Sequence, residues 1–277
     1  MPGFDSCDQY ADFARYVMRE ARYMLDEKRQ SFLAAVIKSS KTRSRTLPVG
    51  TVLFRAQAGH EGLMEFGADD ALPVPVPHPE NRMVPLKDSA YEGRVNPKGI
   101  PCLYLSTEIK TAMAEVRPWI GSYISLGKFV LVRELLVVDC TVDKKRWIPF
   151  QLVPKGHTPK PLSPQDIEAC VWGNINWAFS EPVTRSDNLA EYAPTQVLAE
   201  AFRKEGYGAV KYGSKVGDGD SIAAFDLEIA KMTSCHLYQV KSFTPNFSAA
   251  GLPYDTAYHY GLKSGRKNVK ARNEKSS

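Results

Sequence analysis

The stretch from Gly93 to Pro118 decides the fold of this chain, and it reads GRVNPKGIPCLYLSTEIKTAMAEVRP. Its apolar run at residues 101–106 predicts a strand. Ser106 or Thr107 then offers a hydroxyl side chain of the kind that caps the N-terminus of a helix, and Pro118 cannot continue that helix. A strand followed at once by a short helix is therefore expected at the centre of the chain.

Three side chains that can carry chemistry lie within this stretch. Arg94 precedes the expected strand, Tyr104 lies on it, and Glu115 lies on the helix. The helix is expected to bury a stripe made of Ile109, Met113 and Val116. On a helical projection Glu115 falls on the flank of that stripe, so its carboxylate can reach a cleft beside the core. A cation, an aromatic ring and a carboxylate are thus predicted to meet where loop, strand and helix adjoin.

The chain before this stretch predicts helices, a connector and a long loop. Apolar side chains recur at helical spacing from residue 8 to 38, which predicts one long helix or two short ones. Residues 38–45 are basic and serine-rich, and we expect an exposed connector there, with a domain boundary near residue 46. A β-rich run at 51–55 precedes a stretch to about residue 91, whose prolines exclude regular structure from its middle.

The chain after this stretch predicts further strands and helices. They are strands at 128–132 and 135–140, helices that begin at Ser163-Pro164 and near Pro194, and a hairpin with arms at 209–212 and 221–227. The first helix start has the order of a cap followed by proline. The hairpin arms are joined through residues 217–220, a glycine and aspartate turn.

Composition restricts the class of protein. The net charge is +5, and the six basic residues and one acidic residue between Lys263 and Lys275 account for all of it. Direct nucleic-acid binding by the body of the chain is therefore not expected. The five cysteines and five histidines are dispersed, which gives no metal-site spacing. No apolar run approaches the roughly 20 residues of a membrane span, and no secretory signal is visible at the N-terminus, so a cytoplasmic location is expected.

The ordered combination of motifs resembles the RES domain, a family named for its Arg, Glu and Ser. The resemblance covers roughly residues 50 to 230. The motifs that carry it are Leu-Phe-Arg55-Ala, Gly93-Arg94-Val-Asn96 with Leu103-Tyr104-Leu105, Thr111-Ala112 with Glu115 and Arg117-Pro118, Tyr192 to Glu200, and Gly208-Ala-Val-Lys-Tyr-Gly-Ser214. The proline-rich loop and the segment between Cys140 and Pro161 make this a long version of the domain.

The resemblance implies an α+β fold, with an ADP-ribosyltransferase-like mixed or antiparallel sheet core, flanking helices and an N-terminal helical extension. We expect the extension at residues 1–45, the RES catalytic domain at 46–245 and a basic tail at 246–277. The implied activity is cleavage of the nicotinamide–ribose bond of NAD+ by a glycohydrolase or phosphorylase, in a toxin that an antitoxin holds in check. Metal is not expected, and oligomerisation stays open.

The resemblance also assigns residues. The implied catalytic residues are Arg94, Tyr104, Glu115 and Ser214, and those implied to bind NAD+ are Arg55, Arg94, Asn96, Tyr104 and Ser214. Guanidinium groups suit a pyrophosphate, an aromatic face suits nicotinamide, and a carboxylate stabilises the positive charge that develops on the ribose. Ser221 is the alternative to Ser214 as the serine that faces the cleft.

Two other functions fit the same residues. The cleft could pass ADP-ribose to a protein or nucleic acid, as an ADP-ribosyltransferase does. The chain could also be a catalytically idle binding module that uses its helical N-terminus and basic tail for a partner.

Overall fold

Eight strands form one sheet in the computed structural model, which describes residues 3–63, 73–143, 162–181, 189–242 and 244. Along the sheet the order is β1 (Ser44–Leu47), β7 (Leu135–Asp139), β8 (Ala209–Gly213), β9 (Asp220–Ala224), β5 (Leu103–Ser106), β2 (Val52–Ala58), β6 (Tyr123–Leu131) and β10 (Ala230–Gln239). The β7–β8 pair is parallel and the other pairs are antiparallel. Residues 1–241 form one compact unit, which holds all the helices and strands of the described residues.

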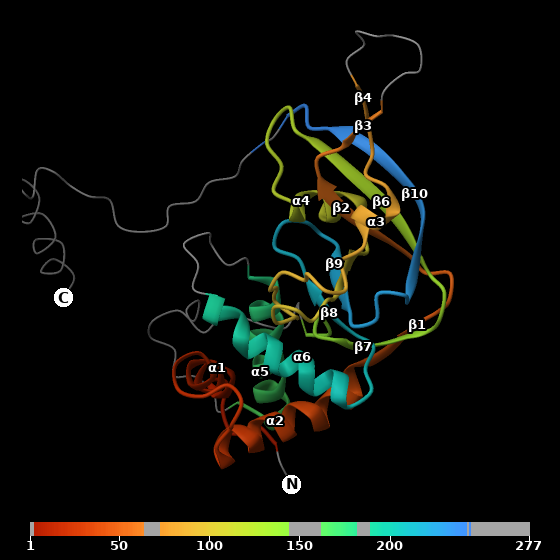
Figure 1. The fold of residues 1–277 in the computed structure, drawn as a ribbon. Coiled ribbons are helices and arrows are strands. Elements are labelled where there is room, and N and C mark those ends of the chain that lie inside the picture. Colours follow the sequence, from red (N-terminus) through yellow and green to blue (C-terminus); the bar gives the residue numbers. More distant parts are fainter. Residues whose placement is uncertain (1–2, 64–72, 144–161, 182–188, 243, 245–277) are drawn as a thin grey trace, which may run out of the picture. The chain divides into compact units, whose positions relative to one another are not determined.

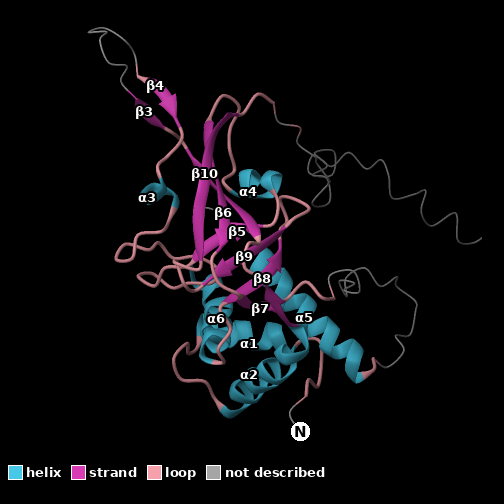
Figure 2. Ribbon diagram, turned by 90° about the vertical axis from the view of Figure 1, so that its right-hand side faces the viewer, coloured by secondary structure: helices cyan, strands magenta, loops and turns pink. Residues whose placement is uncertain are grey.

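Helices lie beside one half of the sheet. The larger ones are α1 (Gln9–Arg19), α2 (Glu27–Ser40), α5 (Pro164–Ser180) and α6 (Ala193–Lys204). Figures 1 and 2 show these four helices together next to β7 and β8, while β6 and β10 extend away from them. The remaining short elements are η1 (Lys41–Arg43), β3 (Glu61–Leu63), β4 (Val74–Val76), α3 (Glu80–Met83), α4 (Ile109–Glu115) and η3 (Leu189–Tyr192). The α+β class predicted from the sequence, a mostly antiparallel sheet flanked by helices, is confirmed.

One hydrophobic core lies on each face of the sheet. The first packs side chains of α1, α2, α5 and α6 against alternate residues of β8 and β9, among them Val210 and Ala223. The second uses the other alternation of the same strands, with Ala209 and Ile222, and joins it to β2, β6 and β7. Because side chains along a strand point alternately to opposite faces, β8 and β9 contribute side chains to both cores. The two N-terminal helices thus share a core with α5 and α6.

Helix ends follow the caps in the sequence. Ser163 accepts a hydrogen bond from the backbone N–H of Asp166 at 3.2 Å, and Pro164 takes the first helical position of α5. The carboxylate of Asp26 accepts from the N–H of Arg29 at 2.8 Å and begins α2. The sequence predicted one long N-terminal helix or two short ones, and the structure has two, α1 and α2. The predicted hairpin is confirmed as the antiparallel pair of β8 and β9.

Two expectations about connecting segments are wrong. The basic segment 38–45 is no exposed connector, because it completes α2, forms η1 and begins β1. Its Arg43 is buried against the ring of Trp172, with its guanidinium 2.5 Å from a carboxylate oxygen of Asp143. The proline-rich stretch contains a strand, β4, whose Pro75 pairs with β3 in a separate two-stranded sheet. Proline is tolerated there because each strand of a two-stranded sheet is an edge strand.

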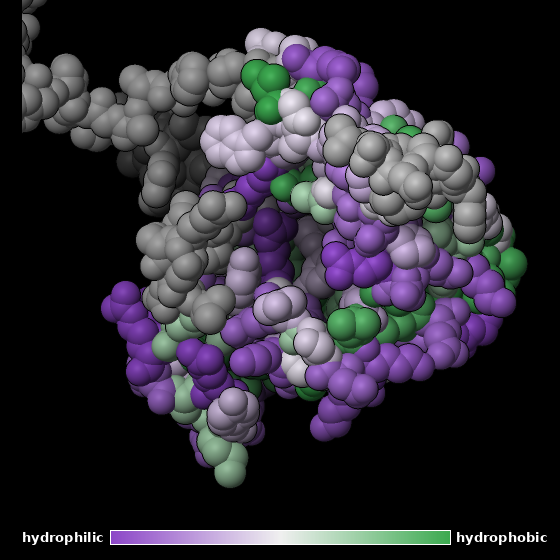
Figure 3. All heavy atoms as spheres, turned by 45° about the horizontal axis from the view of Figure 1, so that its top comes forward, coloured by the Kyte–Doolittle hydropathy of each residue, from purple (hydrophilic) through white to green (hydrophobic). Residues whose placement is uncertain are grey.

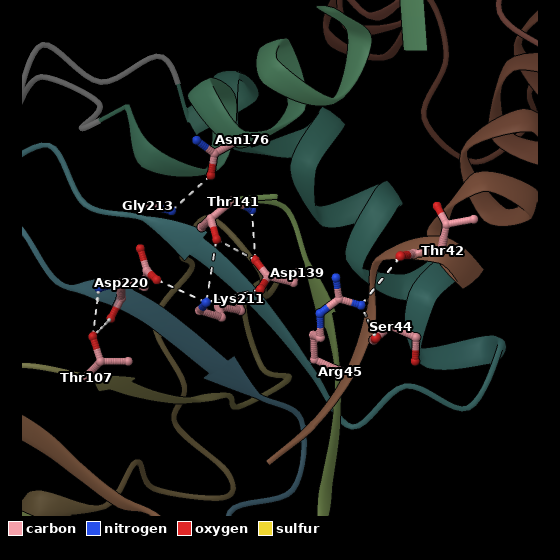
Figure 4. A network of polar contacts seen from close by, with 10 residues as sticks. All are labelled: Thr42, Ser44, Arg45, Thr107, Asp139, Thr141, Asn176, Lys211, Gly213 and Asp220. Carbon is pink, nitrogen blue, oxygen red and sulfur yellow. Dashed lines mark hydrogen bonds and ion pairs between the residues drawn. The ribbon is translucent and has the colours of Figure 1, made fainter. Parts of the chain in front are cut away.

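A polar network ties β7, β8 and β9 together (Figure 4). The ammonium of Lys211 lies 3.1 Å from a carboxylate oxygen of Asp139 and 3.1 Å from one of Asp220. Burial raises the pKa of Asp139, but hydrogen bonds from Thr141 and Lys211 outweigh it and hold that pKa below its ordinary value. The network fixes the register of the strands that lead to the cavity described below.

Within the described residues, no helix combines the length and the apolar character that crossing a bilayer requires.

Candidate active site

A cavity of about 390 Å³ opens where the sheet splits between β2 and β5. These strands share one residue pair, Phe54 with Ser106, so they diverge on either side of it. The lining residues are Phe54, Arg55, Ala56, Gln57, Gly93, Arg94, Tyr104, Leu105, Ser106, Ala112, Glu115, Val116, Tyr192, Tyr212 and Ser221. The space-filling view in Figure 3 shows a hollow on the surface, with hydrophilic side chains around it.

Arg55 bridges the split. Its Nη1 donates a 3.0 Å hydrogen bond to the carbonyl of Tyr104, across the gap between the two strands. Its Nε is buried and has no hydrogen-bond partner in the described part of the chain. Burial lowers the pKa of Arg55 to about 10, which still leaves a cation at neutral pH. A guanidinium cation in the wall of a cavity suits an anionic ligand.

Arg94 lies on a loop that α6 holds in place. The hydroxyl of Thr195 donates to the Arg94 carbonyl at 2.6 Å. The amide of Gln196 donates to three acceptors, which are Glu92 Oε1 at 3.1 Å, the Gly93 carbonyl at 2.9 Å and the Asn96 carbonyl at 3.1 Å. The side chains of Thr195 and Gln196 are both buried. Because these bonds fix the loop backbone, the Arg94 guanidinium is carried to the cavity wall by a rigid support.

Tyr104 supports the same loop from the strand side. Its hydroxyl donates to Asn96 Oδ1 at 2.7 Å and accepts from the N–H of Val95 at 3.1 Å. A Cβ added at Gly93 would lie 2.6 Å from that hydroxyl, so only glycine permits this approach. The ring of Tyr104 lines the cavity while its polar end is used in the loop.

Asn96, expected to bind NAD+, is not among the lining residues. It is 2% exposed, and its amide nitrogen donates to the carbonyls of Tyr91 and Pro97 at 2.9 and 3.3 Å. Together with the bond from Tyr104, these contacts occupy its side chain with the loop. The side chain of Asn96 is therefore occupied by contacts within the loop that carries Arg94, and it holds that loop in its conformation.

Glu115 reaches the cavity from the end of α4, although the helix buries a different face from the one expected. Ile109 is 39% exposed, and the buried residues of the helix are Thr111 and Ala112. The expected stripe was wrong because small residues face inward here, where the loop after β8 comes close. Glu115 lies three and four residues beyond them and shares their face. Glu115 therefore lines the cavity.

The loop that joins β8 to β9 brings Ser214 to Glu115. A Cβ added at Gly217 would lie 2.9 Å from the Thr111 Cα, so the loop packs on α4 closely enough to require glycine. The N–H of Gly219 donates to the Thr111 hydroxyl at 3.0 Å. In this position the Ser214 hydroxyl donates to Glu115 Oε1 at 2.8 Å.

Helix α5 fixes the residue before Ser214. The N–H of Gly213 donates to Asn176 Oδ1 at 2.9 Å (Figure 4), and its carbonyl accepts from the Ser180 hydroxyl at 2.7 Å. Ser214 itself is not among the lining residues, whereas Ser221 is. Ser214 is therefore connected to the cavity through Glu115.

Tyr192 and Tyr212 line the cavity wall, and neither was predicted as a site residue from the sequence. Tyr212 is buried, and burial raises its pKa to about 12, an effect that the guanidinium of Arg94 opposes. Burial also raises the pKa of Tyr104. Both phenols are therefore protonated at neutral pH. Tyr192 lines the wall from η3. Tyr212 pairs with Ser221 across β8 and β9, which places the two side chains on the same face of the sheet.

The arrangement combines two cations, aromatic faces and one carboxylate in a single cavity. That set can bind an anion beside a ring and stabilise positive charge that develops near Glu115. Among the described residues, no group of three or more His, Cys, Asp or Glu side chains gathers in a way that could hold a metal ion.

Comparison with known proteins gives the family. No curated protein matches the chain in sequence. One solved structure, described as the crystal structure of the M. tuberculosis MbcT–MbcA toxin–antitoxin complex, is similar at 14% identity and a TM-score of 0.37 over 74% of this chain and 92% of that one. At this level the similarity supports no conclusion about function. The RES domain model matches residues 72–244, well over half of the chain. This protein belongs to the RES domain family.

Proposed function

We propose that this protein cleaves the nicotinamide–ribose bond of NAD+, with water or phosphate as the acceptor. The observation that carries the proposal is the cavity in which Arg55, Arg94 and Glu115 lie together with tyrosine side chains. Membership of the RES family supports the same conclusion. The proposed catalytic residues are Arg94, Tyr104 and Glu115, and Ser214 is a positioning residue that acts through Glu115.

The two arginines would bind the pyrophosphate. Guanidinium groups form forked, charge-assisted hydrogen bonds to phosphate oxygens. Arg55 supports this role because it lines the cavity and stays cationic at neutral pH. Arg94 adds a second positive charge on the same wall. A neutral ligand would leave the buried charge of Arg55 uncompensated, whereas a pyrophosphate compensates it.

Tyrosine faces would hold the nicotinamide ring. Tyr104, Tyr192 and Tyr212 line the cavity, and an aromatic face attracts a cationic ring such as nicotinamide in NAD+. Because Tyr104 and Tyr212 stay protonated at neutral pH, neither phenol serves as a general base there. Their contribution is to orient the nicotinamide ring.

Glu115 would act on the transition state. When the bond between the ribose C1′ and the nicotinamide nitrogen breaks, its electron pair stays on the nitrogen. Nicotinamide then leaves as a neutral molecule. Positive charge develops on the ribose, and the Glu115 carboxylate stabilises it. Water then forms the new C1′–O bond and loses a proton, which yields ADP-ribose; with phosphate as nucleophile the product is ADP-ribose 1″-phosphate.

We extend the proposal to the biological setting that the family implies, a toxin held in check by an antitoxin. Tyr91 and Trp119 are 90% and 80% exposed, and they lie on the segments next to Arg94 and Glu115. Exposed aromatic side chains are typical of surfaces that a protein partner covers. An inhibitory partner bound there would close the route to the cavity.

The test is incubation of purified protein with NAD+ that carries label in its adenylate part. Release of nicotinamide with all label in small molecules supports cleavage with water or phosphate. Label that enters a protein or nucleic acid indicates ADP-ribosyl transfer instead. Folded, partner-free protein that releases no nicotinamide would contradict both.

A further inference from the structure

Ser214 and Ser221 both lie near the cavity, and their surroundings give them different roles. Building on the proposed cleavage of NAD+, we infer that Ser221 is the serine whose hydroxyl contacts the substrate. Ser214 is a positioning residue that acts by holding Glu115.

The hydroxyl of Ser214 is already engaged. It donates to Glu115 Oε1 at 2.8 Å and accepts from the N–H of Val216 at 3.2 Å. A serine hydroxyl has a single proton to donate, so Ser214 cannot donate to a ligand without releasing the carboxylate. Its place outside the cavity lining agrees with this.

Ser221 lies in a row of side chains that crosses four strands. Tyr212 on β8 pairs with Ser221 on β9, Ser221 pairs with Ser106 on β5, and Ser106 pairs with Phe54 on β2. Residues directly opposite each other in antiparallel strands point to the same face of the sheet. All four line the cavity, so this row forms a continuous part of its wall, with Ser221 near the centre.

The Ser221 hydroxyl is available to a ligand. The residue is 6% exposed and lines the cavity, so its remaining surface faces into that space. Its hydroxyl makes no hydrogen bond to any residue that the structure describes. The neighbouring Ser106 differs, because its hydroxyl donates to the Asp220 carbonyl and accepts from the N–H of Glu108, both at 3.3 Å. Of the two serines in the row, Ser221 has the unused donor.

The two roles predict opposite kinetic effects. A hydroxyl that contacts the substrate before and during bond cleavage contributes to KM and leaves kcat nearly unchanged. A hydroxyl that orients a carboxylate contributes in the transition state, so its loss lowers kcat and leaves KM nearly unchanged. We expect Ser221→Ala to raise KM for NAD+ about fivefold, as the loss of one neutral hydrogen bond does. We expect Ser214→Ala to lower kcat about tenfold or more, because its bond is to a charged group.

The experiment compares Ser221→Ala, Ser214→Ala and Ser214→Thr with the wild-type protein, and thermal unfolding confirms that each variant is folded. Ser234→Ala is the matched control, since it removes a strand serine on β10, away from the cavity. Threonine at residue 214 keeps the hydroxyl and should restore most of kcat. Calorimetric titration of NAD+ into Glu115→Gln and into Glu115→Gln with Ser221→Ala measures the Ser221 contact without turnover.

The outcomes are distinct. Weaker NAD+ binding in the double variant, with the two kinetic effects above, supports the assignment. Active wild-type protein together with a Ser221→Ala variant that matches Ser234→Ala in KM and binding overturns it. A Ser214→Ala variant with raised KM and unchanged kcat also overturns it, because the roles would then be exchanged. If folded wild-type protein releases no nicotinamide, the proposed function is wrong. The assignment of Ser221, which depends on that function, is then wrong as well.

Discussion

The hydroxyl of Ser214 lies 2.8 Å from Glu115 Oε1, although 99 positions separate the two residues in the chain. Glu115 ends α4, and Ser214 begins the loop that packs on the same helix at Thr111. The end of α4 and the end of β8 thus lie close together, because the loop after β8 packs through Gly217 on the small side chains of α4. That contact links the carboxylate, which we propose acts on the ribose, to the core of the fold.

Replacing Glu115 by Gln should abolish most turnover and leave NAD+ binding nearly intact. Glutamine keeps the shape of the side chain and removes the charge that stabilises the transition state, an interaction worth about 3 kcal/mol in comparable sites. We therefore expect kcat for nicotinamide release to fall by about 100-fold or more, with the Kd for NAD+ within about threefold of wild type. A Glu115→Gln variant that keeps half of the wild-type kcat would rule out this role.

Replacing Arg55 by Met should weaken NAD+ binding. Methionine removes the charge-assisted hydrogen bonds to phosphate, worth about 1.5–3 kcal/mol, so KM should rise by about 10- to 100-fold. Arg133→Met, which removes an exposed arginine paired with Asp226, is the matched control. Inorganic pyrophosphate should also raise the melting temperature of the wild-type protein more than that of Arg55→Met. Equal stabilisation of the two proteins would contradict an anion site at Arg55.

Replacing Gln196 by Met should loosen the Arg94 loop. The change removes a donor that serves three buried or half-buried acceptors and nearly preserves side-chain volume. We expect the free energy of unfolding to fall by about 2–3 kcal/mol and kcat/KM to fall at least about tenfold, because Arg94 loses its fixed position. Urea unfolding and nicotinamide release measure the two effects. Gln30→Met, on the exposed side of α2, is the control, and a Gln196→Met variant as stable and active as that control would contradict this support.

The central strand, the helix after it and the 209–227 hairpin were predictable because each has strong local signals. Strand order was not predictable, since it depends on which strands, distant in the chain, pair through their backbone edges. β10 was missed because its exposed side is polar and its apolar alternation is weak. The buried face of α4 was misassigned because Thr111 and Ala112 are inward only where the loop at Gly217 approaches. The split between β2 and β5, which opens the cavity, is likewise a property of pairing and leaves no local pattern.

Replacing Lys211 by Met should lower stability in a pH-dependent way. Burial disfavours the charged form of Asp139 and raises its pKa. The hydrogen bonds from Thr141 and Lys211 together have the larger effect, so the pKa is lowered overall. The stabilisation is therefore present above the ordinary Asp pKa of about 3.9 and is lost as pH falls through the lower, folded-state pKa. For Lys211, burial lowers the pKa, but Asp220 and Asp139 raise it overall. Its contribution is complete below about pH 10.4 and is lost above it.

At pH 7 the Lys211→Met variant should therefore unfold with a free energy about 2–3 kcal/mol below wild type, since it leaves a buried carboxylate without its cation. The difference should shrink as the pH falls below about 3.9, where carboxylates become protonated. Urea unfolding at pH 7 and at about pH 3 measures this. A difference that stays the same at both pH values would exclude the ion pair as its cause.

Nicotinamide release from NAD+ by the purified, partner-free wild-type protein tests the central claim most directly. Chromatography of the reaction should show nicotinamide appearing in step with ADP-ribose or its 1″-phosphate, and Glu115→Gln should run as the inactive control. If folded wild-type protein yields no more nicotinamide than Glu115→Gln does, the cavity at the split of the sheet does not cleave NAD+.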